Sequence, residues 1–365
     1  MIHFVIGTRA QLIKTAPIMA ECKSRDIEYN FILLAQHKET MGEMIDMFGV
    51  KRPDMVIGDL NREISSVQAM AKWVMQVLAF TVKNRRSIFC RDRDGVVIVH
   101  GDALPAFIGA VMAKVAGLKV AHVEAGLRSF NFFEPFPEEL IRVLTWELGL
   151  VDYYFCPNQQ ALRNLAKYSG HKVDTLRNTL CDSLNMALES TVGNTPDDSF
   201  QREPYAVVSL HRYETVSKKG RLELVVDILA EIAERVNLLF ILHPITYKAL
   251  IKHDLYSVLD RNPKISFHPR YDYFTFVKIL RSSEFLVSDG GSNQEECCYL
   301  GHPCLLLRHR TERPDGIGRN AVLSKFDRKV IKDFIENNRL YRFPFNRDEY
   351  SASGMIVDNL DVFVQ

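Results

Sequence analysis

A chain of 365 residues is too long for one hydrophobic core and predicts two domains of roughly 150–200 residues each. With 46 basic and 45 acidic residues, the net charge near +1 argues against nucleic acid or an anionic membrane surface as the partner. Seven cysteines without a CxxC pair, and no apolar run near the ~20 residues of a membrane span, predict a cytoplasmic protein with free thiols rather than disulfides or a zinc site.

Short apolar runs alternate with helical patterns along the chain. The predicted strands are 2–7, 29–35, 96–101, 119–125 and 153–158, followed by 205–210, 238–243, 264–269, 285–289 and 303–308. They are continuously apolar, which is typical of parallel strands covered on both faces. Helices are predicted between them, for example at 104–117 and 221–235. This alternation predicts an α/β protein with two doubly wound, Rossmann-like domains that face each other across a cleft.

The alternation stops at 186–204, a polar stretch with two prolines, which we interpret as a linker. We therefore predict an N-terminal domain over 1–185 and a C-terminal domain over 186–348. The amphipathic segment 349–365 is predicted to form a helix that packs back on the first domain.

Reactive side chains follow many of the predicted strands, which is where ligands bind in open α/β sheets. They are Thr8 and Arg9, His100 and Asp102, Glu124, His211 and Arg212, His243, and Asp289 to Ser292. Glu124 ends a buried strand, so its carboxylate would be desolvated unless it is paired or bound. Together, the positions of Glu124, Asp102 and Glu138 predict a cluster of carboxylates for proton transfer. The alternatives are an N-cap role for Asp102 and a plain helix start for Pro137 and Glu138.

The stretch 285–300 has the pattern of a strand, a Gly-rich turn and a helix start. Backbone N–H groups of Gly290, Gly291 and Ser292, with the helix dipole, predict a phosphate site, although a tight turn alone would also need glycine. Glu296 would be repelled by a diphosphate unless it accepts from a ribose diol. It is therefore a candidate ribose ligand, whereas a dipole partner in the first helical turn, shared with Glu295, is the alternative.

Three further groups of basic residues are candidate anion ligands. The turn at 7–17 lacks GxGxxG, so a dinucleotide site is not predicted, and Arg9 and Lys14 could face the cleft or be solvated. His211 and Arg212 suit a diphosphate leaving group. Arg313 lies in a loop after the last strong strand and could be surface charge.

Ten strings occur in order: GTR…IK.AP (7–17), AQHKETM (35–41), VHGD (99–102), HVEAGLRS (122–129), PFPEELIR (135–142), NTLCDSL (178–184), HRYE (211–214), GGSNQEE (290–296), LGHP (300–303) and TERP (311–314). Together they resemble the motifs of the UDP-N-acetylglucosamine 2-epimerase family. The resemblance implies the glycosyltransferase-B type of fold and inversion at C2 of a UDP-2-acetamido sugar, UDP-GlcNAc to UDP-ManNAc or a close relative. UDP would be eliminated to leave a 2-acetamidoglucal and then added back, without cofactor or metal, for surface polysaccharide synthesis.

The resemblance also implies roles by position. The catalytic residues would be Asp102, Glu124, Glu138 and His211, with Asp102 and Glu138 as acid and base. The substrate-binding residues that match family positions would be Arg9, Lys14, Gly291, Ser292, Glu296 and Arg313. The further substrate-binding residues, which we predict from the sequence itself, are Arg142, Arg212, His243, Phe276 and Gly290. Phe276 would lie beside the uracil. Gln36 and His37 fall in a possible regulatory region, and a homodimer is implied.

The chain departs from the family pattern at Ala10 and Gln11, where Pro-Glu is usual, at Arg177, where Gly is usual, and at Ser292, which is displaced relative to the glycines. These departures leave the exact sugar and any allosteric activation open. The alternative functions are a hydrolysing 2-epimerase that releases a free ManNAc-type sugar and UDP, a glycosyltransferase of the same fold, and a nucleotide-sugar sensor without turnover.

Overall fold

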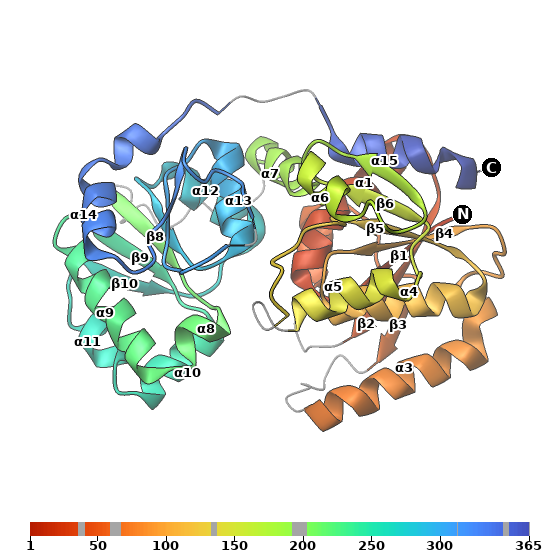
Figure 1. The fold of residues 1–365 in the computed structure, drawn as a ribbon, viewed down its shortest axis with the longest axis horizontal. Helices are drawn as coiled ribbons and strands as arrows, with labels where there is room; N and C mark the ends of the chain where they lie inside the picture. Colours follow the sequence, from red (N-terminus) through yellow and green to blue (C-terminus); the bar gives the residue numbers. More distant parts are fainter. Residues whose placement is uncertain are drawn as a thin grey trace. The chain divides into compact units, whose positions relative to one another are not determined.

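The computed structural model describes residues 1–35, 41–58, 67–132, 137–191, 203–311, 313–345 and 350–364. The chain divides into two compact units, unit 1 with Met1–Met186 and Glu349–Gln365 and unit 2 with Ala187–Asp348. Figure 1 shows each unit as a sheet with helices on its two faces. Among the described residues, no helix combines the length and the apolar character that crossing a membrane requires.

The described part of unit 1 contains a seven-stranded sheet in the order β3-β2-β1-β4-β5-β6-β7. The strands are β1 (Ile2–Ile6), β2 (Tyr29–Ala35), β3 (Met55–Gly58), β4 (Val96–His100), β5 (Lys119–Val123), β6 (Tyr153–Cys156) and β7 (His171–Asp174). All neighbouring pairs are parallel. The strand order reverses between β1 and β4, and the ends of these two strands therefore form a switch point at which ligands bind in such sheets.

The helices of unit 1 are α1 (Arg9–Ser24), α2 (Gly42–Met47), α3 (Val67–Ile88), α4 (Leu104–Ala116), α5 (Glu138–Glu147), α6 (Gln159–Asn164), α7 (Leu180–Glu189), α15 (Ala352–Leu360) and the 3₁₀ turn Asp361–Phe363. Helix α4 packs against both α3 and α5, whereas α15 packs against α1 (Figure 1). The carboxylate of Asp182 in α7 accepts the N–H of Ser353 at 2.7 Å and fixes the start of α15. The C-terminal helix is thus part of unit 1.

The described part of unit 2 repeats this arrangement with a six-stranded sheet, in the order β10-β9-β8-β11-β12-β13. The strands are β8 (Tyr205–Ser209), β9 (Asn237–Ile241), β10 (Ile265–His268), β11 (Leu286–Ser288), β12 (Cys304–Leu306) and β13 (Ala321–Leu323). All neighbouring pairs are again parallel. The order reverses between β8 and β11, so the switch point of this unit lies at their ends.

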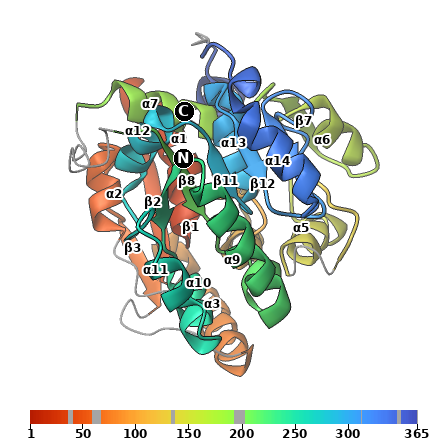
Figure 2. The ribbon, with the colours of Figure 1, turned by 90° about the vertical axis from the view of Figure 1, so that its left-hand side faces the viewer.

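The helices of unit 2 are α8 (Tyr213–Val216), α9 (Lys219–Ala233), α10 (Pro244–Lys252), α11 (Tyr256–Asp260), α12 (Tyr273–Ser282), α13 (Gly291–Leu300), α14 (Arg328–Glu336) and the 3₁₀ turn Asn338–Tyr341. One core cluster joins α9, α11 and α14 to the strands, and it includes Leu229, Leu259 and Phe334 from these helices and Phe240 from β9. Figure 2 shows β8, β11 and β12 in succession, with α9 in front of this sheet. The rigid sheet fixes the positions of the loops that follow β8 and β11.

Each predicted strand is present and ends within two residues of its predicted end, whereas β3, β7 and β13 were not predicted. All three lie at a sheet edge and are only three or four residues long. An edge strand is covered incompletely, so its sequence lacks the continuous apolar run on which the prediction depended.

Three alternatives that the sequence left open can be compared with the structure. Ala103, and not Asp102, is the N-cap of α4, and no side chain caps that helix. Pro137 is the N-cap of α5 and not its first helical residue, so Glu138 begins the helix. Glu295 and Glu296 lie in the second turn of α13, because the helix already begins at Gly291. The alternative explanation of these two acids as first-turn dipole partners is therefore excluded.

Candidate functional site

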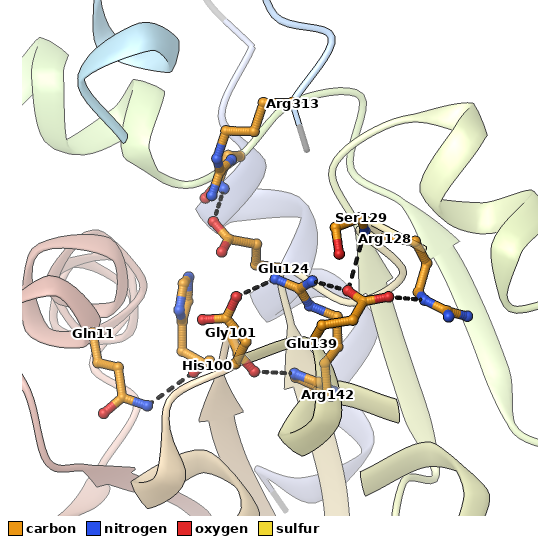
Figure 3. Close-up of polar contacts among 12 residues, drawn as sticks. Gln11, His100, Gly101, Glu124, Arg128, Ser129, Glu139, Arg142 and Arg313 are labelled. Atoms are coloured by element: carbon orange, nitrogen blue, oxygen red, sulfur yellow. Dashed lines mark hydrogen bonds and ion pairs between the residues drawn. The ribbon is translucent and has the colours of Figure 1, made fainter. Parts of the chain in front are cut away.

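Gln11 joins the ends of β1 and β4 at the switch point of unit 1. Thr8 caps α1 by accepting the N–H of Gln11, while the Gln11 side-chain oxygen accepts from Gly7 N at 3.0 Å and Thr8 N at 3.2 Å. The Gln11 amide also donates to the carbonyl of His100 at 2.9 Å (Figure 3). This capping box fixes where α1 starts relative to the end of β4. The substitution relative to the family pattern at this position therefore has a defined structural role.

Glu124 lies directly after β5, in the left-handed region with φ +62°. Its carboxylate accepts hydrogen bonds from Lys14 of α1 and from the side-chain amide of Asn178, just before α7. All three residues are buried. The Lys14 ammonium offsets the charge of the desolvated carboxylate, and Asn178 satisfies a further lone pair. Lys14 is therefore not a solvated lysine, and Asn178 is a site residue that the sequence analysis missed.

Asp102 is held by an ion-pair network that extends along α5. Arg142 donates to Asp102 and, at 2.9 Å, to Glu139. Glu139 also accepts from Arg128 and, at 3.1 Å, from the N–H of Ser129 (Figure 3). Burial would raise the pKa of Glu139, but the Arg128 hydrogen bond, the Ser129 N–H and Arg142 hold it below its usual value. The network fixes α5 against the turn after β4.

Arg142 is 2% exposed and is occupied by two carboxylates. We therefore assign it a positioning role and not the predicted contact with substrate. Glu138 is the half-buried first residue of α5, one position before the anchored Glu139. Helix α5 thus carries one candidate acid, while its next turn orients another, Asp102.

In unit 2, the fully buried Asp289 joins the ends of β8 and β11. Its carboxylate accepts the N–H of His211 and of Arg212, each at 3.0 Å. The His211 imidazole lies 3.7 Å from Asp289 and stacks on His243 with ring centroids 4.8 Å apart. The predicted residues His211, Arg212 and His243 therefore meet at the switch point of this unit.

Basic side chains surround His211. Burial lowers the pKa of His211, Asp289 acts against this, and Arg212, Arg270 and Arg308 act with it. A neutral imidazole among arginines can donate a hydrogen bond to an anion without adding charge. Arg270 and Arg308 were not predicted, although each lies two residues after a strand, β10 and β12 respectively. The rule that selected His211 would have found both.

Position 290 requires glycine because neighbouring side chains lie close to its backbone. Its N–H donates to the Ser288 hydroxyl at 3.0 Å, and a Cβ at position 290 would lie 3.1 Å from the His211 ring and 2.8 Å from the Asn293 side chain. Gly291 then begins α13, with Ser292 half-buried in its first turn. The N-terminal end of this ten-residue helix therefore lies beside His211, where its dipole favours an anion.

The two acids of α13 have different partners. The buried Glu296 accepts from the Asn293 amide at 3.0 Å. Glu295 instead accepts from Arg313 at 2.6 Å and from the Tyr299 hydroxyl at 3.0 Å. Glu295 thus fixes Arg313, which is 7% exposed, whereas Glu296 is held by Asn293 of the same helix.

The remaining predicted residues are placed less specifically. Arg9 is the half-buried first residue of α1, and Phe276 is half-buried in the first turn of α12. Gln36 and His37 lie outside the described residues.

Residues 20–342 match the family model described as UDP-N-acetylglucosamine 2-epimerase. The UDP-N-acetylglucosamine 2-epimerase of Methanocaldococcus jannaschii is 29% identical over 94% of each chain. A solved structure of the Methanocaldococcus jannaschii enzyme in complex with UDP-GlcNAc and UDP aligns with a TM-score of 0.82 at 26% identity over 99% of each chain. The Neisseria meningitidis enzyme bound to UDP-GlcNAc gives 0.83 at 26% identity, also over 99% of each chain.

A glycosyltransferase of kitacinnamycin aligns over 100% of this chain and 98% of its own, with a TM-score of 0.56 at 11% identity, and shares the fold alone. Together with the two parallel sheets, these likenesses confirm the predicted class of two Rossmann-like domains of the glycosyltransferase-B type.

Proposed function

The chain belongs to the UDP-N-acetylglucosamine 2-epimerase family of isomerases, and from this premise we propose that it inverts C2 of a UDP-2-acetamido sugar without hydrolysing it. The proposed reaction interconverts UDP-GlcNAc and UDP-ManNAc, or close relatives, for surface polysaccharide synthesis. Complexes of two relatives with UDP-GlcNAc support the substrate class.

The proposed elimination needs a base and a stabilised leaving group at the same time. A carboxylate takes the C2 proton, the electron pair of the C2–H bond forms the C1=C2 bond of the 2-acetamidoglucal, and the C1–O pair leaves with UDP. The C2 proton is not α to a carbonyl, so positive charge develops at C1 as the diphosphate departs. Protonation of the glucal at C2 from the other face and re-addition of UDP at C1 complete the inversion.

We assign proton transfer to Asp102 and Glu138, and stabilisation of the positive charge to Glu124. The observation that carries this division is the burial of Glu124 between Lys14 and Asn178, which both donate to its Oε2 and hold the carboxylate in place. Asp102 keeps 28% of its side chain exposed, and Glu138 is half-buried, so both can reach a substrate. Glu124 also lies beside the turn that carries Asp102, since its Oε1 is 3.5 Å from the Cβ position of Gly101.

We assign recognition of UDP to unit 2. The first turn of α13, with Gly290, Gly291 and Ser292, is the proposed diphosphate site, because N–H groups and the helix dipole converge there. His211 and Arg212 would stabilise the departing phosphate, and Glu296 would accept from the ribose hydroxyls. Phe276 is the proposed uracil neighbour. Arg313 contributes positive charge from a position that Glu295 fixes.

Incubation with UDP-GlcNAc in D₂O, followed by NMR, tests this function. Deuterium at C2 of a UDP-linked product is the expected result. Free ManNAc-type sugar would instead identify the hydrolysing reaction, which the same carboxylates could perform. No exchange at C2 would refute both and would favour a glycosyltransferase or a sensor. The homodimer that the family implies is tested separately by sedimentation equilibrium.

A further inference from the structure

A second connection ties α5 to the turn that carries Asp102. Trp146, in the last turn of α5, donates its indole N–H to Nδ1 of His122 in β5 at 3.0 Å. The other ring nitrogen of His122, Nε2, lies 2.7 Å from the carbonyl oxygen of Gly101. Trp146 and His122 are each 1% exposed. A buried relay therefore runs from α5 through β5 to the residue before Asp102.

The two hydrogen-bond partners of His122 determine which nitrogen of its imidazole carries the hydrogen. An indole N–H can only donate, so Nδ1 must accept, and a carbonyl can only accept, so Nε2 must carry the hydrogen. Both hydrogen bonds form only in the neutral Nε2–H tautomer. A proton added to Nδ1 would face the indole N–H and break the Trp146 contact.

The charges around His122 are mixed. Arg142 of α5 faces it, as do Asp102 on the turn and Glu124 at the end of its own strand. Burial lowers the pKa of His122 to about 4, Arg142 acts in the same direction, and the Gly101 carbonyl and the two carboxylates oppose it. The imidazole is thus neutral above about pH 5.

Gly101 is the point at which the relay acts on the site. Its φ of +67° is a left-handed conformation, and its N–H donates to the carbonyl of Val123 at 2.9 Å. Because His122 also holds the carbonyl, both backbone polar groups of Gly101, the residue before Asp102, have fixed partners. The Arg142 ion pair then fixes the Asp102 carboxylate from the same helix that begins with Glu138.

We propose that Trp146 and His122 are positioning residues for proton transfer. Trp146 selects the Nε2–H tautomer of His122, and in this tautomer His122 holds the Gly101 carbonyl. The position of Asp102 relative to Glu138 on α5 is thereby fixed. This inference rests on the proposed epimerase function for its consequence, but the tautomer and its cause belong to the structure itself. The sequence pattern alone indicates only that Trp146 is a core residue.

The Trp146→Phe variant tests the relay, with Trp73→Phe as its matched control. Trp73 of α3 is also buried, at 7% exposure, and its indole nitrogen has no hydrogen-bond partner among the described residues. Both variants lose the same core volume, but only Trp146→Phe loses the bond to His122. We expect kcat for C2 exchange to fall about tenfold more in Trp146→Phe than in the control, with KM within about twofold, as for the loss of one buried hydrogen bond.

Two further readouts separate positioning from packing. The ¹⁵N spectrum of the wild-type histidines, with His122 assigned from its absence in His122→Gln, should show the Nε2–H tautomer and no titration above pH 5. In Trp146→Phe, Nδ1 of His122 loses its donor and no longer has to accept, so the ¹⁵N spectrum should show the Nδ1–H tautomer beside the Nε2–H form, whereas Trp73→Phe should keep the wild-type spectrum.

An Nδ1–H tautomer, or titration near pH 6.5 in the wild type, would overturn the proposal whether or not the protein exchanges C2. Equal exchange rates in Trp146→Phe and Trp73→Phe would overturn it as well. A wild type with the expected tautomer but no exchange refutes the proposed function, and with it the catalytic consequence of the relay, while the tautomer assignment stands.

Discussion

Lys14 donates a hydrogen bond to Glu124 where their side chains are only 6% and 4% exposed. Because no bulk water screens such a pair, neither charge is tolerated without the other. The pair connects helix α1 to the end of β5, and the two residues are 110 positions apart in the chain. The structure of this edge of the sheet therefore depends on Glu124, the residue to which we assign stabilisation of the positive charge.

Removing the cation alone should therefore be costly. We expect Lys14→Met to lower the free energy of unfolding of unit 1 by about 3–5 kcal/mol, because Glu124 is left buried without its partner. The Lys14→Met/Glu124→Gln double variant should recover most of this loss without recovering C2 exchange. Both tryptophans, Trp73 and Trp146, lie in unit 1, so fluorescence during urea unfolding reports on this unit. A single variant as stable as the wild type would contradict the pairing.

Glu138→Gln should lower the rate of C2 deuterium exchange by about 10²–10⁴-fold, as expected when a general acid or base is lost. UDP binding by calorimetry and the melting temperature should stay close to those of the wild type. The matched control is Glu147→Gln at the other end of α5, where the carboxylate is exposed and pairs with Lys167. An exposed pair contributes little, so this variant should behave as the wild type. Unchanged turnover in Glu138→Gln would refute the role of Glu138.

The neighbouring Glu139 should instead affect stability, with a defined pH dependence. Its pKa is lowered in the folded protein, so its contribution is fully present above the unfolded value of about 4.3 and is lost as pH falls through the folded value. The difference in free energy of unfolding between the wild type and Glu139→Gln should be constant from pH 6 to 8 and should become smaller below about pH 4. Urea titrations across this range measure it, and a gap that widens in acid would show that the sign is wrong.

The sequence alone placed several candidate residues at strand ends, because the end of a strand can be recognised from local sequence. Asp102, Glu124 and His211 each follow a strand whose apolar run is continuous, so an error of one or two residues in the boundary did not change the assignment. The same rule, applied to the strands that end at 268 and 306, would have added Arg270 and Arg308. These omissions came from applying the rule incompletely and were not a limit of the sequence.

Other site features depend on contacts that no local pattern encodes. Asn178 reaches Glu124 across 54 residues, and Gln11 reaches the His100 carbonyl across 89. Trp146 has the spacing of a core residue in α5, and its single polar contact is decided by the packing of that helix on β5. Side-chain partners of this kind are set by tertiary structure, so a sequence alone gives the residue types but not the pairs.

In unit 2, Glu296→Gln should weaken UDP binding by about ten- to a hundredfold, which corresponds to one or two hydrogen bonds to a charged acceptor. Binding of 2′,3′-dideoxy-UDP should be the same in the variant and the wild type, because that ligand lacks the hydroxyls that Glu296 would accept. Calorimetry with both ligands completes a double-mutant cycle. An equal loss for the two nucleotides would place Glu296 elsewhere than at the ribose.

From the environment of His302 we predict that the stability of unit 2 falls in acid, independently of catalysis. Burial, reinforced by Arg342, lowers the pKa of His302 to about 3, while Nε2 lies 3.0 Å from the Ser283 hydroxyl. The unfolded chain binds this proton near pH 6.5 and the folded chain does not, so stability is present above pH 6.5 and declines as pH falls. The expected contribution is about 1.4 kcal/mol per pH unit between pH 6 and 4. In His302→Asn the slope of unfolding free energy against pH, followed by circular dichroism, should be shallower by about that amount. An unchanged slope would show that His302 is already protonated in the folded protein or titrates alike in both states.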